Sequence, residues 1–380
     1  MATSIFEGSP AELIGDSNQL LLSLRVIEDP RINRNKLHSL INILVIALIA
    51  VGSGAHSWGH IAYYGSLHEA WFAKHLDLQN GIPSHDTFSR VFGLLKPEAV
   101  EHALQVWSST RPGAMRLGRQ IAFDGKRLRG ASQWQEEGES VHIVNAYCPE
   151  EGVTIGQTMV QSKQHEITAI PTLIKQLDLR GAICSGDAAF TQKEIVKQLK
   201  SAGADYCLSL KDNQPTLRTA VESLFGGRFP STMFYEAIEK NRGRIEKRKI
   251  WVSHQIQRIK KHEEWEGLQS VIRLESQRGD GGEGEIRHYI CSIKLKPEEA
   301  LSIIRRHWGI ENGLHRALDV YFREDQWQNR AKIAAANLAV VRKIAGTILS
   351  KLDPKIPLIY KMTALSSSEQ FRTRFINFEF

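Results

Sequence analysis

The spacing of apolar residues predicts helices in the first third of the chain. An almost unbroken apolar segment covers residues 40–51, and helical spacing continues through residue 109. Ser84 can cap the helix that follows it, and Pro97 suits the first turn of the next one. Because a membrane span needs ~20 apolar residues, we expect residues 40–51 to be a buried helix and expect no membrane segment. Residues 1–112 are predicted to form an N-terminal helical domain.

The pattern changes after a linker near residue 113. Short apolar strands alternate with amphipathic helices up to residue 226. The strands include one that runs into Asp124 and a turn, a hairpin over residues 141–160, and one that ends at Asp187. A helix is expected from residue 166, with a boundary near Pro171. This alternation is typical of an α/β core, which we assign to residues 113–226.

The last part of the chain divides into two regions. Residues 227–292 favour strands and turns, and they are predicted to form a β-rich insertion. Helical spacing returns after Pro297, and an apolar helix near residues 330–352 should belong to the core. Residues 293–380 are therefore predicted to complete the core and to end in helices.

Charge is distributed unevenly along the chain. The formal net charge is +7, but residues 1–110 hold 7 Lys and Arg against 10 Asp and Glu. A basic body favours a polyanionic partner such as DNA, although an ordinary solvated surface would look similar. The four cysteines are far apart and lie in part within apolar runs. Cys184 and Cys207, which lie in the apolar runs, are predicted to be small buried side chains, and this fits a reducing cytoplasm.

Two aspartates share a local context. Asp124 and Asp187 each follow a short apolar strand, where open α/β sheets usually bind ligands. Each could instead cap a turn or a helix.

A third group of polar residues recurs every four positions. His307, Glu311, His315 and Asp319 would share one side of a helix, which could also be a solvated stripe. Zinc binding by the histidines lacks the H-E-x-x-H spacing and a nearby cysteine. Oxygen ligands from two aspartates and a glutamate favour Mg²⁺ or Mn²⁺, and a pair of such ions suits phosphodiester cleavage.

Basic residues beside these acids and in a run within the insertion are candidates for phosphate contacts, although the run in the insertion could instead be an exposed charged strand. They are Lys126, Arg127, Arg129, Lys211, Arg242, Arg244, Arg248, Arg305 and Arg306. Trp251, beside the basic run of the insertion, either stacks on a DNA base or belongs to the core of the insertion.

Several longer pieces carry a family resemblance. They include IAFDGKRLRG, GQTMVQSKQHEITAIP, GDAAFTQKEIVKQLKSAGADYCLSLKDNQPTL and RRHWGIENGLHRALDVYFREDQWQNR. With these pieces in order across residues 28–345, the chain resembles ISAs-type insertion-sequence transposases and the H-repeat-associated proteins. The resemblance implies an RNase H-like catalytic domain with a DDE triad of Asp124, Asp187 and Glu311.

The sequence departs from the pattern of broader relatives near the third acid. Those relatives have a Tyr and an Arg seven and four residues before the glutamate, where this chain has Ile304 and His307. Many closer relatives have Trp at Arg316. His307, His315 and Asp319 are accessory candidates, and Asp319, Glu324 and Asp325 are rival third ligands.

The predicted function is that of a DNA transposase. It would cut double-stranded DNA at element ends with two Mg²⁺ or Mn²⁺ ions and join the 3′-hydroxyl to target DNA. We expect a dimer when the protein is bound to DNA, in a bacterial cytoplasm and associated with the nucleoid. The alternatives are a domesticated relative that binds DNA without turnover and a plain metal-dependent nuclease.

Overall fold

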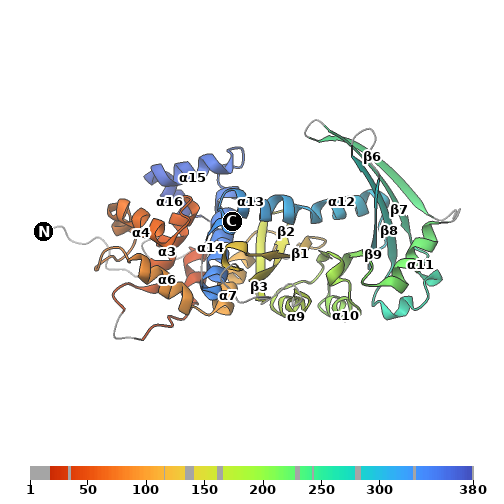
Figure 1. The fold of residues 1–380 in the computed structure, drawn as a ribbon, viewed down its shortest axis with the longest axis horizontal. Helices are drawn as coiled ribbons and strands as arrows, with labels where there is room; N and C mark the ends of the chain where they lie inside the picture. Colours follow the sequence, from red (N-terminus) through yellow and green to blue (C-terminus); the bar gives the residue numbers. More distant parts are fainter. Residues whose placement is uncertain are drawn as a thin grey trace.

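A mixed β-sheet of nine strands extends from the middle of the molecule to one end (Figure 1). The computed structural model describes residues 18–32, 36–114, 116–132, 141–160, 166–226, 232–241, 244–278, 284–327 and 331–378. The strands are β1 (Gln120–Arg127), β2 (His142–Cys148), β3 (Val153–Val160), β4 (Ile183–Gly186), β5 (Asp205–Leu210), β6 (Met233–Asn241), β7 (Arg244–Ser253), β8 (Ser270–Arg278) and β9 (Glu285–Cys291). Their order is β3-β2-β1-β4-β5-β9-β8-β7-β6, and the predicted α/β class is confirmed.

Only the middle of this sheet is parallel. β1 pairs with β4 and β4 with β5 in parallel, whereas the other neighbouring pairs are antiparallel. β2 and β3 form the predicted hairpin. The strands of the predicted insertion continue the same sheet, because β9 pairs with β5.

Strand β1 is longer than the sequence pattern indicates. The pattern places a turn after Asp124, but β1 continues to Arg127. Residues 125–127 still pair with β2, whereas pairing with β4 ends at Phe123 and Gly186. Hydrogen bonds to β2 therefore keep the chain extended, and the β4 side of β1 becomes free at Asp124.

Helices cover both faces of the sheet. On one face lie α9 (Glu166–Gln176), α10 (Lys193–Ser201) and α11 (Pro215–Phe225). The other face is covered by α12 (Pro297–His307), which is followed by α13 (Arg316–Val320). Ile303 and Ile304 of α12 pack against Ile250 and Val252 of the insertion. The boundary expected at Pro171 is absent, since α9 continues through it.

The remaining long helices form one cluster beside the sheet. They are α2 (Gln19–Arg25), α3 (Leu40–Gly52), α4 (Trp58–Leu67), α5 (Glu69–His75), α6 (His85–Leu94), α7 (Pro97–Ser109), α14 (Lys332–Lys351), α15 (Leu358–Ser367) and α16 (Glu369–Ile376). The Ser84 cap, the start at Pro97 and the buried helix α3 are confirmed. Among the described helices, α14 alone is long and apolar enough to cross a membrane, and 83% of that window is buried. The N-terminal helices therefore share their core with the last three helices.

Candidate active site

Two predicted acids lie side by side where β1 and β4 stop pairing. The last opposite residues are Phe123 and Gly186, so Asp124 and Asp187 occupy the next positions of the parallel register. Neighbouring strands lie ~4.8 Å apart, so these two carboxylates are close together where the pairing of β1 with β4 ends. The Asp187 Oδ1 also accepts a 3.0 Å hydrogen bond from the Ala189 N–H, so the capping alternative is present as well.

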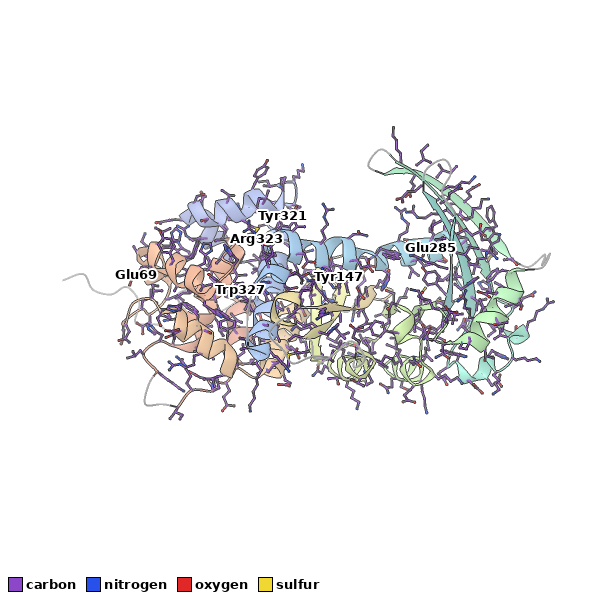
Figure 2. The ribbon with its side chains drawn as sticks, viewed as in Figure 1. Glu69, Tyr147, Glu285, Tyr321, Arg323 and Trp327 are labelled. Carbon is purple, nitrogen blue, oxygen red and sulfur yellow. The ribbon has the colours of Figure 1, made fainter. Side chains whose placement is uncertain are left out.

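Glu311 approaches this end of the β1–β4 pairing from the face of the sheet that α12 covers. It belongs to the π-helical segment η6 (Ile310–His315) between α12 and α13, which lie in line in Figure 1. Ile310 is fully buried and clusters with Ala122 and Tyr147, so the wide turn packs on the central sheet, where Figure 2 labels Tyr147. The predicted helix is present, but its turn at Glu311 is wider than an α-helical turn. Such turns are rare and are frequently found at functional sites.

The three acids act on one another electrostatically. Burial raises the pKa of Asp124 to about 8, and the Glu311 and Asp187 carboxylates add to this increase. Burial also raises the pKa of Glu311, while Arg287 and Lys211 oppose the increase and Asp187 adds to it. The three carboxylates therefore repel one another.

The chemistry of these donors suits a hard divalent cation. Carboxylate oxygens are the ligands that Mg²⁺ and Mn²⁺ prefer, and a bound cation would relieve the repulsion. Within the part of the chain that the structure describes, no three His, Cys, Asp or Glu side chains are grouped closely enough to hold an ion. In this arrangement the three acids therefore do not form a closed set of metal ligands.

The histidines of the four-residue series also face the sheet. His307 Nδ1 lies 3.0 Å from Ser185 Oγ on β4. His315 Nδ1 lies 3.5 Å from Asp124 Oδ2. Burial lowers the pKa of His307 to about 4 and that of His315 to about 3, so both imidazoles are neutral at pH 7. His307 and His315 are turned toward the sheet, whereas Glu311 of the same series is exposed.

Asn145 contributes a contact that the sequence analysis missed. It is fully buried on β2, directly opposite Asp124. Its Nδ2 lies 3.4 Å from His315 Nε2. Because an amide nitrogen donates, His315 Nε2 accepts and the Nδ1 proton faces Asp124. In the sequence, this contact could have been indicated by the asparagine in the middle of the mostly apolar strand HIVNAYC.

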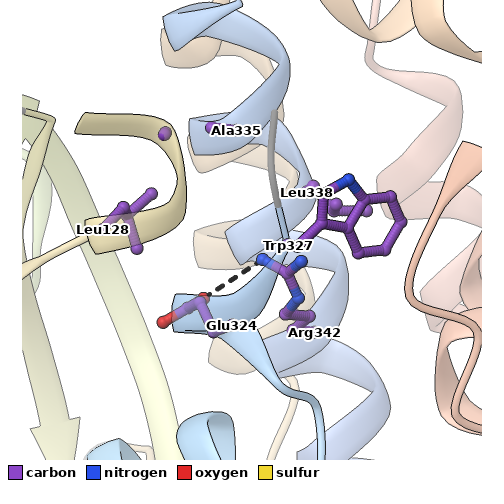
Figure 3. A pocket seen from close by; sticks show the side chains of 7 residues that line it. Leu128, Glu324, Trp327, Ala335, Leu338 and Arg342 are labelled. Atoms are coloured by element: carbon purple, nitrogen blue, oxygen red, sulfur yellow. Dashed lines mark hydrogen bonds and ion pairs between the residues drawn. The ribbon is translucent and has the colours of Figure 1, made fainter. Parts of the chain in front are cut away.

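Lys126 is enclosed by carboxylates. Its Nζ lies 2.6 Å from an oxygen of Asp319, 3.0 Å from Glu324 and 3.5 Å from Asp325. Arg342 also pairs with Glu324, beside a small pocket (Figure 3). Although burial raises the pKa of Glu324, Lys126 and Arg342 bring it to about 2. Lys126 is therefore not free to contact a phosphate, and the rival acids are engaged with it.

The other predicted cations differ in their surroundings. Three are paired with Glu246, Glu239 and Glu150, respectively: Arg248, Arg305 and Arg306. Three are exposed: Arg127, Arg129 and Lys211. Arg242 and the side chain of Arg244 lie outside the described residues.

Trp251 lies on the surface of the insertion. It alternates with the buried Ile250 and Val252, so it points away from α12. Its ring is tilted against Phe234 with centroids 5.1 Å apart, and the Arg273 guanidinium lies 5.7 Å from its centroid. Trp251 is half-buried and does not belong to the core between the insertion and α12, while base stacking stays a prediction.

Two family models match the chain. The model described as "Transposase DDE domain" matches residues 116–347. The model described as "DDE_Tnp_1-associated" matches residues 21–108. The first match contains all three acids.

Known proteins resemble the chain over most of its length. The "Uncharacterized protein in dhlA 3'region" of Xanthobacter autotrophicus is 41% identical over 77% of this chain and 100% of that protein. The "H repeat-associated putative transposase YhhI" of Escherichia coli (strain K12) is 33% identical over 87% of this chain and 90% of that protein. The solved piggyBac transposase synaptic complex with hairpin DNA overlays 97% of this chain and 80% of that chain, with a TM-score of 0.43 and 12% identity. An overlay this loose adds nothing to the family assignment.

Proposed function

We propose a specific activity for this chain, which belongs to the DDE transposase family. It cleaves double-stranded DNA at the ends of a mobile element and joins the freed 3′-hydroxyl to target DNA. Asp124, Asp187 and Glu311 are the catalytic acids. Joining requires two element ends to be held together, so the active form on DNA is a dimer.

One observation carries this proposal. The register of β1 and β4 puts Asp124 beside Asp187, and both carboxylates interact electrostatically with Glu311. These residues come from distant parts of the chain, which local capping does not explain. The order β3-β2-β1-β4-β5, with a parallel β1-β4-β5 centre, supports the RNase H-like core that the resemblance implies.

The three acids would hold two Mg²⁺ or Mn²⁺ ions. When bound, such ions activate the attacking hydroxyl and stabilise the leaving oxygen. The neutral His315, held by Asn145, orients the Asp124 carboxylate. Arg127 is exposed three residues after Asp124 and supplies a cation for the DNA backbone.

The acids are tested by substitutions that remove charge and preserve shape. Asp124→Asn, Asp187→Asn and Glu311→Gln should each reduce Mg²⁺-dependent cleavage of element-end DNA by at least about 10³-fold, because each removes a metal ligand. Duplex binding should be retained. Since the acids repel one another, the melting temperature of each variant should not fall.

Asp319→Asn is the matched control for the third acid. It leaves the Glu311 carboxylate in place and removes a partner of Lys126 instead. Retained cleavage in Glu311→Gln, with loss in Asp319→Asn, would assign the third ligand to Asp319. Wild-type cleavage after exhaustive removal of divalent ions would overturn the metal-dependent mechanism.

A further inference from the structure

Two cations lie just beyond the last paired residues of the β5–β9 ladder. The last opposite residues of this antiparallel pair are Leu210 and His288, so Lys211 and Arg287 occupy the next opposite positions. Side chains alternate along both strands, and Tyr289 lies on the face that packs against α12. Lys211 and Arg287 therefore share the face from which Glu311 approaches. Lys211 is among the cations that the sequence predicts to contact phosphate, whereas Arg287 is not.

Both cations act electrostatically on Glu311. The Arg287 guanidinium carbon is 4.5 Å from the centroid of the Trp308 ring, three residues before Glu311. Arg287 and Lys211 each oppose the increase that burial causes in the pKa of Glu311. The register places Asp124, Asp187 and Ser209 level with one another, so Lys211 lies two residues farther along the chain than the level of the acids, and Arg287 lies opposite it on the insertion.

This arrangement has a cost for folding. Like charges directly opposite each other on neighbouring strands destabilise a sheet. Arg287 pairs with Glu285 through two 2.7 Å hydrogen bonds, but the Glu285 side chain is 60% exposed. Among the described residues, Lys211 takes part in no ion pair. An anion held between the two cations would offset their repulsion.

We infer that Lys211 and Arg287 form a binding site for a backbone phosphate of DNA beside the acids. The planar guanidinium can bind two phosphate oxygens, and its stacking on Trp308 orients it, while the lysine supplies a point charge. This phosphate site rests on the proposed function and adds a specific DNA contact to it. It gives the insertion a direct part in holding DNA next to the cleaved bond.

The test compares Lys211→Gln and Arg287→Gln with Arg180→Gln. Arg180 is a matched control because it also pairs with an acid two residues away, Asp178. Arg180 precedes β4 and Asp187 follows it, so the two residues lie at opposite ends of this strand. Lys211→Gln should fold at least as stably as the wild type, since it removes a repulsion.

The measured quantity is the salt dependence of binding to a nicked duplex of arbitrary sequence, with Ca²⁺ in place of Mg²⁺. Each contacted phosphate contributes ~0.9 to the slope of log K against log salt concentration. Lys211→Gln and Arg287→Gln should each lower this slope by about one. Arg180→Gln should leave it unchanged.

The outcomes separate the site from the proposed function. Wild-type slopes in both Lys211→Gln and Arg287→Gln, with cleavage intact in the wild type, would overturn only the phosphate site. Lowered slopes in both variants, together with a wild-type protein that never cleaves DNA, would support the site and overturn the proposed function. Stabilisation of the wild type by millimolar inorganic phosphate, lost in Lys211→Gln without any change in slope, would reassign the site to free phosphate.

Discussion

Asp124 is surrounded by groups that act on its charge in opposite directions. Burial raises the pKa of the carboxylate, and repulsion by Glu311 and Asp187 adds to the increase. The Nδ1 of His315 faces the same carboxylate at 3.5 Å, and Asn145 holds the imidazole from the other side. At the scale of single residues, the ionised form of Asp124 is therefore disfavoured unless a bound cation stabilises it.

The stability of the metal-free protein should fall as pH rises because of Asp124. Its pKa is about 8 in the folded protein against an ordinary value of 3.8, so folding favours the protonated form. That contribution is complete below the ordinary value and is lost as pH rises toward the folded value. Between about pH 6 and about pH 8, unfolding free energy relative to Asp124→Asn should drop by about 1–3 kcal/mol in urea denaturation.

The comparison with Asp124→Asn isolates this group. Burial also raises the pKa of Glu101 to about 8, but Glu101 is present in both proteins. A difference between the two proteins that does not vary with pH would contradict the prediction. Added Mg²⁺ should reverse the trend, because a metal binds the ionised carboxylate.

The insertion presents two different faces. Toward α12, Ile250 and Val252 are fully buried in an apolar core. On the other face, Trp251 lies against Phe234, which is 50% exposed. Alternation along β7 therefore separates a packing face from a face that is available to a partner.

Trp251→Ala should separate DNA handling from stability. A half-buried ring stabilises the fold less than a core residue, and base–aromatic stacking contributes ~1–3 kcal/mol per base. The variant should bind intact duplex almost normally and lose about 5- to 150-fold in affinity for nicked or distorted ends. Fluorescence anisotropy with both kinds of DNA measures the difference.

Ile250→Ala is the neighbouring control. Ile250 is fully buried, so this change should cost about 2–5 kcal/mol of stability and weaken every activity together. If Trp251→Ala melts as early as Ile250→Ala and loses binding to all DNA equally, the stacking role must be abandoned. The basic residues would then be the DNA contacts of the insertion.

Across the whole molecule, one buried ion cluster joins the elements that carry the acids. Lys126 of β1 pairs with Asp319 of α13 and with Glu324, and Glu324 pairs with Arg342 of α14. This ion cluster therefore connects three parts of the fold. They are β1, which carries Asp124, α13, which follows the turn of Glu311, and the helical cluster. Positions of the acids depend on contacts outside the site itself.

Lys126→Met should be strongly destabilising. It leaves buried carboxylates without their cation, which typically costs about 3–5 kcal/mol. Arg129→Met is the matched control: its side chain is 79% exposed and approaches Asp325 from solvent, so the change should stay within about 0.5 kcal/mol. Chemical denaturation of both variants measures the difference, and equal stabilities would mean that the cluster does not hold the elements together.

Much of the local structure followed from the sequence alone. Ser84 and Pro97 marked helix starts correctly, and the apolar segment after residue 39 is a buried helix. Hydrophobic spacing depends on residues only a few positions apart, so these features could be predicted from local pattern. Asp124, Asp187 and Glu311 could be named because two follow apolar strands and because the motifs around all three resemble a family.

What surrounds those residues was decided only by the tertiary structure. The partners of Lys126 and the place of Arg287 depend on strand pairing and on helices that pack from distant parts of the chain. A basic residue beside an acid reads alike in sequence whether it is buried in an ion cluster or exposed to DNA. Local order is set by neighbouring residues, but the charge that a side chain experiences is set by what the fold brings against it.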